Sequence, residues 1–204
     1  MKKTYKELFH ELKHHLPFTA LATILALAIS LFFINFSLDI NEKIFHSLHF
    51  IHIFASSIVT AGIFYKYKKK AIQAILVGIT GAIIIGSLSD VIFPWLGSLI
   101  FQFSPHFHLP LIEIPLIILS IALGGSLLGV LTTLTKIPHL FHVGISVFAS
   151  LFYLITYTSN LDVLFLILSF LIILISVIIP CCISDILYPF FFLGKKIKSC
   201  NCKN

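Results

Sequence analysis

The run AIQAILVGITGAIIIGSLSDVIF, from Ala71 to Phe93, contains one charged side chain, Asp90. A helix of about 20 apolar residues is long enough to cross the hydrocarbon core of a bilayer. The rest of the 204-residue chain has the same character, since 58% of its residues are hydrophobic and only 11% are charged. Soluble domains carry about 25% charged residues, so most of this surface must face lipid. We therefore predict an all-α integral membrane protein of the cell membrane, whose first partner is the lipid bilayer.

Five more runs of similar length bring the predicted number of transmembrane helices to six. The six predicted spans are Pro17–Leu38, Ile44–Tyr65, Ala71–Phe93, Pro110–Thr135, His139–Tyr157 and Leu161–Tyr188. The third and sixth runs stay apolar beyond a proline, to about Phe103 and Leu193, and a proline inside a helix bends it. A chain of this length is expected to form a single membrane domain, residues 1–204.

The lysines predict how the helices are oriented. The formal net charge is +6, and apart from Lys43 every lysine precedes the first span, follows the sixth, or joins spans two and three or four and five. Cytoplasmic loops are rich in lysine and arginine, so we expect both termini, including the tail 195–204, to be cytoplasmic. Because the chain has no arginine and its lysines sit between apolar runs, no nucleic-acid partner is expected.

Rare polar residues recur in the same order in the two halves of the chain. The matching elements are His15-Leu16-Pro17 with His108-Leu109-Pro110, His46-x-x-His49 with His139-x-x-His142, and Ser89-Asp90-x-x-Phe93-Pro94 with Ser184-Asp185-x-x-Tyr188-Pro189. A duplicated unit of three spans enters the membrane from opposite sides, as in many transporters. We therefore predict two inverted three-helix repeats, about 15–103 and about 108–194.

These polar residues predict two clusters of imidazole and carboxylate groups, one toward each membrane face. Histidines three residues apart share a helix face, and intramembrane acids usually have a functional role. Pro94 and Pro189 remove helix hydrogen bonds to the carbonyls of Asp90 and Asp185, which would add ligand oxygens. The predicted outer metal ligands are His46, His49, Asp90 and His108, and the predicted inner ligands are His139, His142, Asp185 and His15.

His52, Glu113 and a run of glycines lie outside the predicted ligand sets. His52 has no counterpart in the second half, where Ile145 takes its place, so we interpret it as accessory. Glu113 aligns with Ala20 and is either interfacial or specific to the outer site. The small residues of Gly124-Gly125-x-x-x-Gly129 predict a close contact between two helices.

Imidazole and carboxylate ligands suit zinc, iron, manganese, cobalt or nickel, while protons are the competing ligand. The sequence thus predicts a permease or exporter for a divalent transition-metal cation, working by alternating access. The expected depth of the clusters, near the two faces, argues against this because transporter sites usually lie near the midplane. A homodimer would offer a pathway at its interface instead.

Two alternatives remain open. His-x-x-His with an aspartate is enough to hold a catalytic zinc in a membrane-embedded hydrolase. Alternatively, the polar pairs only lock the helices of a non-catalytic scaffold or accessory subunit. Enzymatic activity is the less favoured interpretation, because both predicted clusters keep their core histidines and aspartate, whereas an enzyme would need only one. The chain also lacks a phosphate-binding loop, a nucleophile elbow, a His-Glu-x-x-His motif and a dinucleotide fingerprint.

Overall fold

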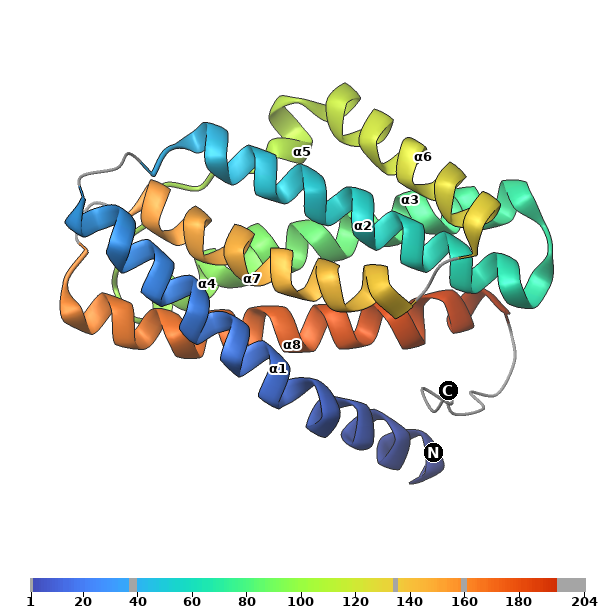
Figure 1. The fold of residues 1–204 in the computed structure, drawn as a ribbon, viewed down its shortest axis with the longest axis horizontal. Helices are drawn as coiled ribbons and strands as arrows, with labels where there is room; N and C mark the ends of the chain where they lie inside the picture. The colour runs from blue at the N-terminus through green and yellow to red at the C-terminus, as the bar shows by residue number, and fades with distance from the viewer. Residues whose placement is uncertain (1, 37–39, 134–135, 159–160, 194–204) are drawn as a thin grey trace.

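The computed structural model describes residues 2–36, 40–133, 136–158 and 161–193, of which 2–15, 136–140, 181–187, 189–191 and 193 are described by their backbone alone. Within these ranges the chain is helical and contains no strand. The long helices run lengthwise through an elongated bundle (Figure 1). Their bounds are α1 Lys2–Asn35, α2 Glu42–Lys68, α3 Ala71–Ser87, η1 Leu88–Ile92, α4 Phe93–Ile100, α5 Pro110–Glu113, α6 Pro115–Thr132, α7 Lys136–Tyr157 and α8 Val163–Leu193.

Among the described residues, five helical segments are long and apolar enough to cross a membrane, which supports the predicted membrane class. They are Leu16–Asn35, Glu42–Lys68, Ala71–Ile100, Pro115–Thr132 and Val163–Pro180. The part of α7 with described side chains, Phe141–Tyr157, is apolar but shorter. Large apolar side chains remain exposed on the outside of the bundle, such as Leu116 and Leu131, each 78% exposed. Such a surface fits lipid rather than water.

The segment from Ala71 to Ile100 continues through Pro94 as one helical segment. A turn of π-helix, η1, joins α3 to α4, and the amide of Phe93 donates to the carbonyl of Leu88 instead of to the carbonyl four residues before it. Single π-turns of this kind often occur at functional sites. The wider turn carries Asp90, which is fully buried.

Helix α2 lies at the centre of the packing and contacts α3, α6, α7 and α8. Its start is fixed by Asn41, whose side-chain oxygen accepts hydrogen bonds from the amides of Lys43 and Ile44. An N-cap of this kind satisfies amide groups that the first helical turn leaves free. Helix α1 packs against α7 and α8, and α6 packs against α2 and α3.

The predicted contact at Gly124-Gly125-x-x-x-Gly129 is present between α6 and α2. A Cβ atom added at Gly125 would collide with the Phe54 carbonyl and the Ser57 hydroxyl, and one at Gly129 would collide with the Ile58 carbonyl. The glycines therefore let the two backbones approach each other closely.

Candidate functional site

Histidines and carboxylates gather in two neighbouring clusters along the first three turns of α2. The outer cluster, formed by Glu42, His46 and His108, lies where α2 begins and where the chain enters α5. The deep cluster, formed by His49, His52 and Asp90, lies one turn further along α2. In Figure 1 the start of α2, the end of α7 and the start of α8 lie together at the left end of the bundle. The turn from α2 to α3, which carries Lys66, Lys68, Lys69 and Lys70, lies at the opposite end.

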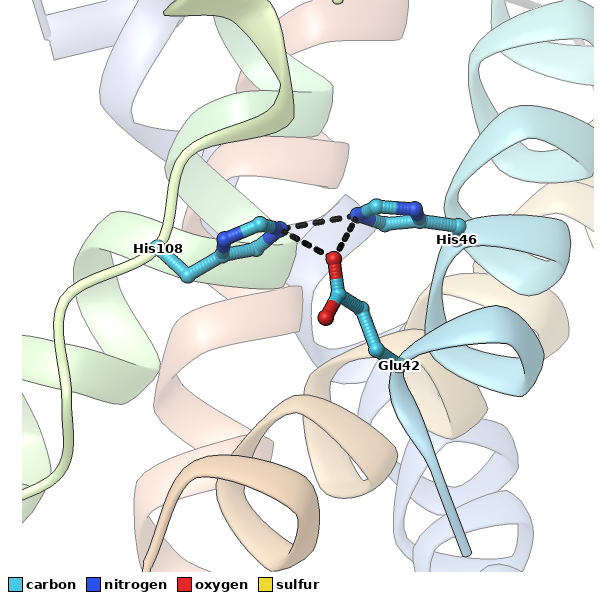
Figure 2. Close-up of side chains that lie close together, drawn as sticks. All are labelled: Glu42, His46 and His108. Atoms are coloured by element: carbon cyan, nitrogen blue, oxygen red, sulfur yellow. Dashed lines mark hydrogen bonds and ion pairs between the residues drawn. The ribbon is translucent and has the colours of Figure 1, made fainter. Parts of the chain in front are cut away.

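The outer cluster contains three potential metal ligands, Glu42, His46 and His108 (Figure 2). The two histidine Nε2 atoms are 2.8 Å apart, and each is 3.7 Å from Glu42 Oε1. A point equidistant from three atoms at these separations lies about 2.0 Å from each, which is within the range of Zn–N and Zn–O bonds. Among the described residues this is the group of three whose ligand atoms all lie within 4.8 Å of one another.

The first turn of α2 and the segment before α5 bring these ligands together. Glu42 and His46 are four residues apart on α2, so they share one face. His108 precedes α5, and its ring stacks on Tyr157 of α7 with ring centroids 4.7 Å apart. The Tyr153 hydroxyl interacts with the amide of His108 at 3.4 Å and with the carbonyl of His106 at 3.3 Å. Helix α7 therefore fixes the segment that supplies the third ligand.

Glu113 orients His108 from the other side of the imidazole ring. Its Oε1 atom lies 2.7 Å from His108 Nδ1. An ionised carboxylate only accepts hydrogen bonds, so Nδ1 donates to it. In a neutral His108 the Nε2 atom then carries the lone pair, which accepts a hydrogen bond from His46 Nε2 at 2.8 Å and is the position that a metal ion would use. Carboxylate groups commonly orient metal-binding histidines in this way.

The deep cluster is centred on the carboxylate of Asp90. Its Oδ2 atom lies 2.8 Å from His49 Nδ1 and 2.7 Å from His52 Nδ1. Its Oδ1 atom accepts hydrogen bonds of 2.8 Å from the hydroxyls of Ser89 and Ser146. All five side chains are completely or almost completely buried. Both carboxylate oxygens thus accept hydrogen bonds, and through these bonds the carboxylate orients the two imidazole rings. Asp90 does not belong to the three-ligand group of the outer cluster.

The second half of the chain contributes to the deep cluster through α7. The ring of His142 lies parallel to that of His52, with centroids 5.7 Å apart and an interplanar angle of 6°. Ser150 donates to the carbonyl of Ser89, next to Asp90. On both α2 and α7, these polar residues follow helical spacing and form stripes along one face. The stripe on α2 comprises His46, His49, His52, Ser56 and Thr60, and the stripe on α7 comprises His142, Ser146, Ser150, Tyr153 and Tyr157.

The predicted outer residues are thus divided between two clusters. His49 joins Asp90 in the deep cluster, whereas His46 joins His108 in the outer cluster. His142, which we predicted as an inner ligand, stacks on His52. The other predicted inner ligands, His15, His139 and Asp185, lie on α1, α7 and α8, and their side chains are outside the described residues.

Sequence reasoning overlooked Glu42 and undervalued His52. The spacing of Glu42, His46, His49 and His52, at intervals of four, three and three, already places all four on one helix face. The second half has Ile145 where the first has His52, but a histidine present in one half alone can still form a hydrogen bond.

No protein-family model, no curated protein and no solved structure matches this chain.

Proposed function

We propose that this protein transports a divalent transition-metal cation across the cell membrane, with Glu42, His46 and His108 forming the site that captures the ion from one side. The observation that carries this proposal is the convergence of three ligand atoms on a point about 2.0 Å from each, which matches the bond lengths of zinc. Imidazole nitrogens with a carboxylate oxygen suit zinc, iron, manganese, cobalt or nickel better than an alkali-metal ion.

The polar stripes of α2 and α7 support transport rather than simple binding. The two helices pack against each other, and the stripes extend from the outer cluster past the deep cluster toward the opposite end. Buried polar side chains in a membrane are costly, so a series of them along one helix interface is typical of an ion pathway. His52 lies about 15 Å from the start of α2, a helix about 40 Å long. The deep cluster is therefore closer to the middle of the bundle than the sequence suggested.

The helix contacts support the arrangement as two inverted repeats with six spans. If α1, α2 and α3–α4 correspond to α6, α7 and α8, then the main contacts between the long helices occur in matching pairs. Helix α1 packs on α7 and α8, just as α6 packs on α2 and α3. The lysine distribution favours cytoplasmic termini, which puts the outer cluster on the external side. Alternating access would then move the two halves against each other.

A membrane-embedded metal-dependent hydrolase is the second candidate, favoured by one specific observation. Two histidines and one glutamate, with further coordination positions open, are also the ligand set of several catalytic zinc sites. Glu42 is 54% exposed on its side chain, so water and a substrate could reach the metal. The two candidates differ in whether the ion itself crosses the bilayer.

The direct test is metal uptake into liposomes that contain the purified full-length chain. Zinc, manganese, cobalt, nickel and iron would be added outside, with a metal-sensitive dye trapped inside. We expect saturable uptake of at least one of these ions, reduced at least about tenfold in apparent affinity in Glu42→Gln and His46→Gln, because even indirect partners of a metal contribute 10–100-fold. The control is His106→Gln, which removes an exposed imidazole outside the three-ligand group. Stoichiometric metal binding without uptake would contradict transport and favour the hydrolase.

A further inference from the structure

The deep cluster contains a buried carboxylate that faces no lysine or arginine. The groups that contact Asp90 are the imidazoles of His49 and His52 and the hydroxyls of Ser89 and Ser146. A charge buried in a bilayer without a counter-charge is strongly unfavourable. The ionised cluster therefore needs one positive charge, from an imidazolium or a bound cation.

Among the side chains that the structure describes, no lysine or arginine on the neighbouring helices supplies this positive charge to Asp90. Helix α8 from Val163 to Pro180 has no titratable side chain, and Asp90 is the one charged residue between Ala71 and Ile100. The remaining titratable groups on the helices packed around the cluster are Glu42, Lys43 and His46 at the start of α2, Tyr65 to Lys68 at its end, and His142, Tyr153 and Tyr157 on α7.

Each of the two imidazoles keeps one nitrogen that is not bonded to Asp90. Both Nδ1 atoms face the same oxygen, Asp90 Oδ2, so each Nε2 atom lies on the far side of its ring. The Nε2 atoms of His49 and His52 are buried and have no hydrogen-bond partner among the described residues. Neither histidine belongs to the described group of side chains that could hold a metal ion, but each neutral ring whose Nδ1–H donates to Asp90 offers its Nε2 lone pair to a proton.

We propose that His49, Asp90 and His52 form a proton-binding site that exchanges its proton for the metal ion. One proton adds to the Nε2 lone pair of His49 or His52, while both Nδ1–H groups keep donating to Asp90. The net charge of the cluster changes from −1 to zero, and no other bond is broken. The proton is thus the counter-charge that the buried carboxylate lacks.

The coupling to the metal rests on the proposed function. His49 follows His46 by one helical turn, so a positive charge on the deep cluster disfavours a divalent cation in the outer cluster. Linkage is reciprocal, and a bound metal must therefore favour release of the proton. Because His52 stacks on His142 and Ser146 donates to Asp90, protonation also acts on the contact between the two halves.

The first experiment measures the proton site without any metal. The full-length chain, labelled with ¹⁵N-histidine and held in lipid nanodiscs, would be titrated from about pH 8 to about pH 5, the range in which histidine changes charge. Signals would be assigned with His49→Gln and His52→Gln. We expect the Nε2 signal of one of these two residues to shift from an unprotonated to a protonated nitrogen. Both Nε2 atoms remaining unprotonated at the lowest pH would overturn the proposal.

The second experiment measures coupling in liposomes that contain a zinc dye and a pH dye. In the unaltered chain we expect zinc entry to be accompanied by proton exit, and an outward proton gradient to accelerate zinc entry several-fold. Asp90→Asn should abolish the proton flow while keeping zinc binding at the outer cluster within about twofold. His106→Gln should behave like the unaltered chain.

The outcomes separate this inference from the proposed function. Zinc entry without proton exit would overturn the exchange and leave the transporter intact. If zinc neither binds nor enters, the transporter proposal falls and the exchange falls with it, while the nitrogen titration still decides whether the cluster binds a proton. If Asp90→Asn does not fold, that titration, which uses the unaltered carboxylate, carries the test.

Discussion

At the scale of single residues, Asp90 acts mainly through the groups it orients. Its four hydrogen bonds join α2, η1 and α7 at one point. The sequence predicted a site that pairs Asp90 with His49, because an acid in an apolar run and a histidine pair at the facing depth are recognisable signals. It did not predict that both oxygens would be occupied by hydrogen bonds, since the serine on α7 and the tilt of each ring depend on packing that no local pattern contains.

Removing the carboxylate should destabilise the bundle. Asp90→Leu leaves the Nδ1–H groups of two buried imidazoles without their acceptor, and truncating one member of a buried network costs about 3–5 kcal/mol. Asp90→Asn keeps one acceptor oxygen and should cost less. The measurement is thermal unfolding of the purified chain in detergent, with the lipid-facing Ile167→Ala as a control. Equal melting temperatures for Asp90→Leu and the control would contradict this role.

Zinc binding should weaken as the pH falls. Only neutral imidazoles bind the metal, so protons compete with zinc for the ligand nitrogens of the outer cluster. The dissociation constant should rise steadily from about pH 7.5 to about pH 5.5. A competition titration with a zinc-sensitive dye measures it, and a constant affinity across this range would exclude both imidazoles as ligands.

At the scale of helices, α2 combines two requirements on different faces. One face carries the polar stripe, whose histidines contact η1, α7 and the segment before α5. Another face lies so close to α6 that Gly125 and Gly129 admit no side chain. Helix positions and the glycine contact could be predicted from apolar run length and small-residue spacing. The π-turn could not, because a proline predicts a disturbed helix without saying whether the helix ends, bends or widens. This turn also explains the depth of Asp90, since the helix continues to Ile100 beyond it.

Two adjacent glycines provide a matched test of the α2–α6 contact. Gly125→Ala would force a methyl group against the Phe54 carbonyl, whereas at Gly124 the nearest atom, Phe54 Cε2, is an ordinary contact at 3.8 Å. Overpacking costs about 1–3 kcal/mol, so Gly125→Ala should lower the melting temperature by several degrees and Gly124→Ala should not. Equal effects of the two substitutions would mean that the helices do not approach as described.

At the scale of the whole molecule, the two halves are interleaved. The first long helix of each half packs against the second and third helices of the other half, and α2 contacts α7 along the centre. The sequence predicted the helical membrane class from composition, and the inverted repeat remains a prediction that these contacts favour. The division of the expected outer site into two clusters could not be predicted, because spacing along α2 gives a shared face but not which partner reaches each turn.

The orientation in the membrane can be tested with single cysteines in a variant whose four native cysteines are replaced by serine. Lys43→Cys should react with a membrane-impermeant maleimide in intact cells, and Lys69→Cys should react only after the membrane is opened, because lysine-rich loops stay in the cytoplasm. The reverse pattern would place the outer cluster on the cytoplasmic side and reverse the proposed direction of capture.

The central claim is that a divalent metal ion binds Glu42, His46 and His108, and zinc K-edge X-ray absorption of the full-length chain with one equivalent of zinc tests it most directly. We predict nitrogen and oxygen neighbours at about 2.0–2.1 Å with the multiple-scattering pattern of two imidazoles. That pattern should lose one imidazole in His46→Gln. A dominant sulfur shell at about 2.3 Å, or a spectrum unchanged by His46→Gln, would contradict the claim.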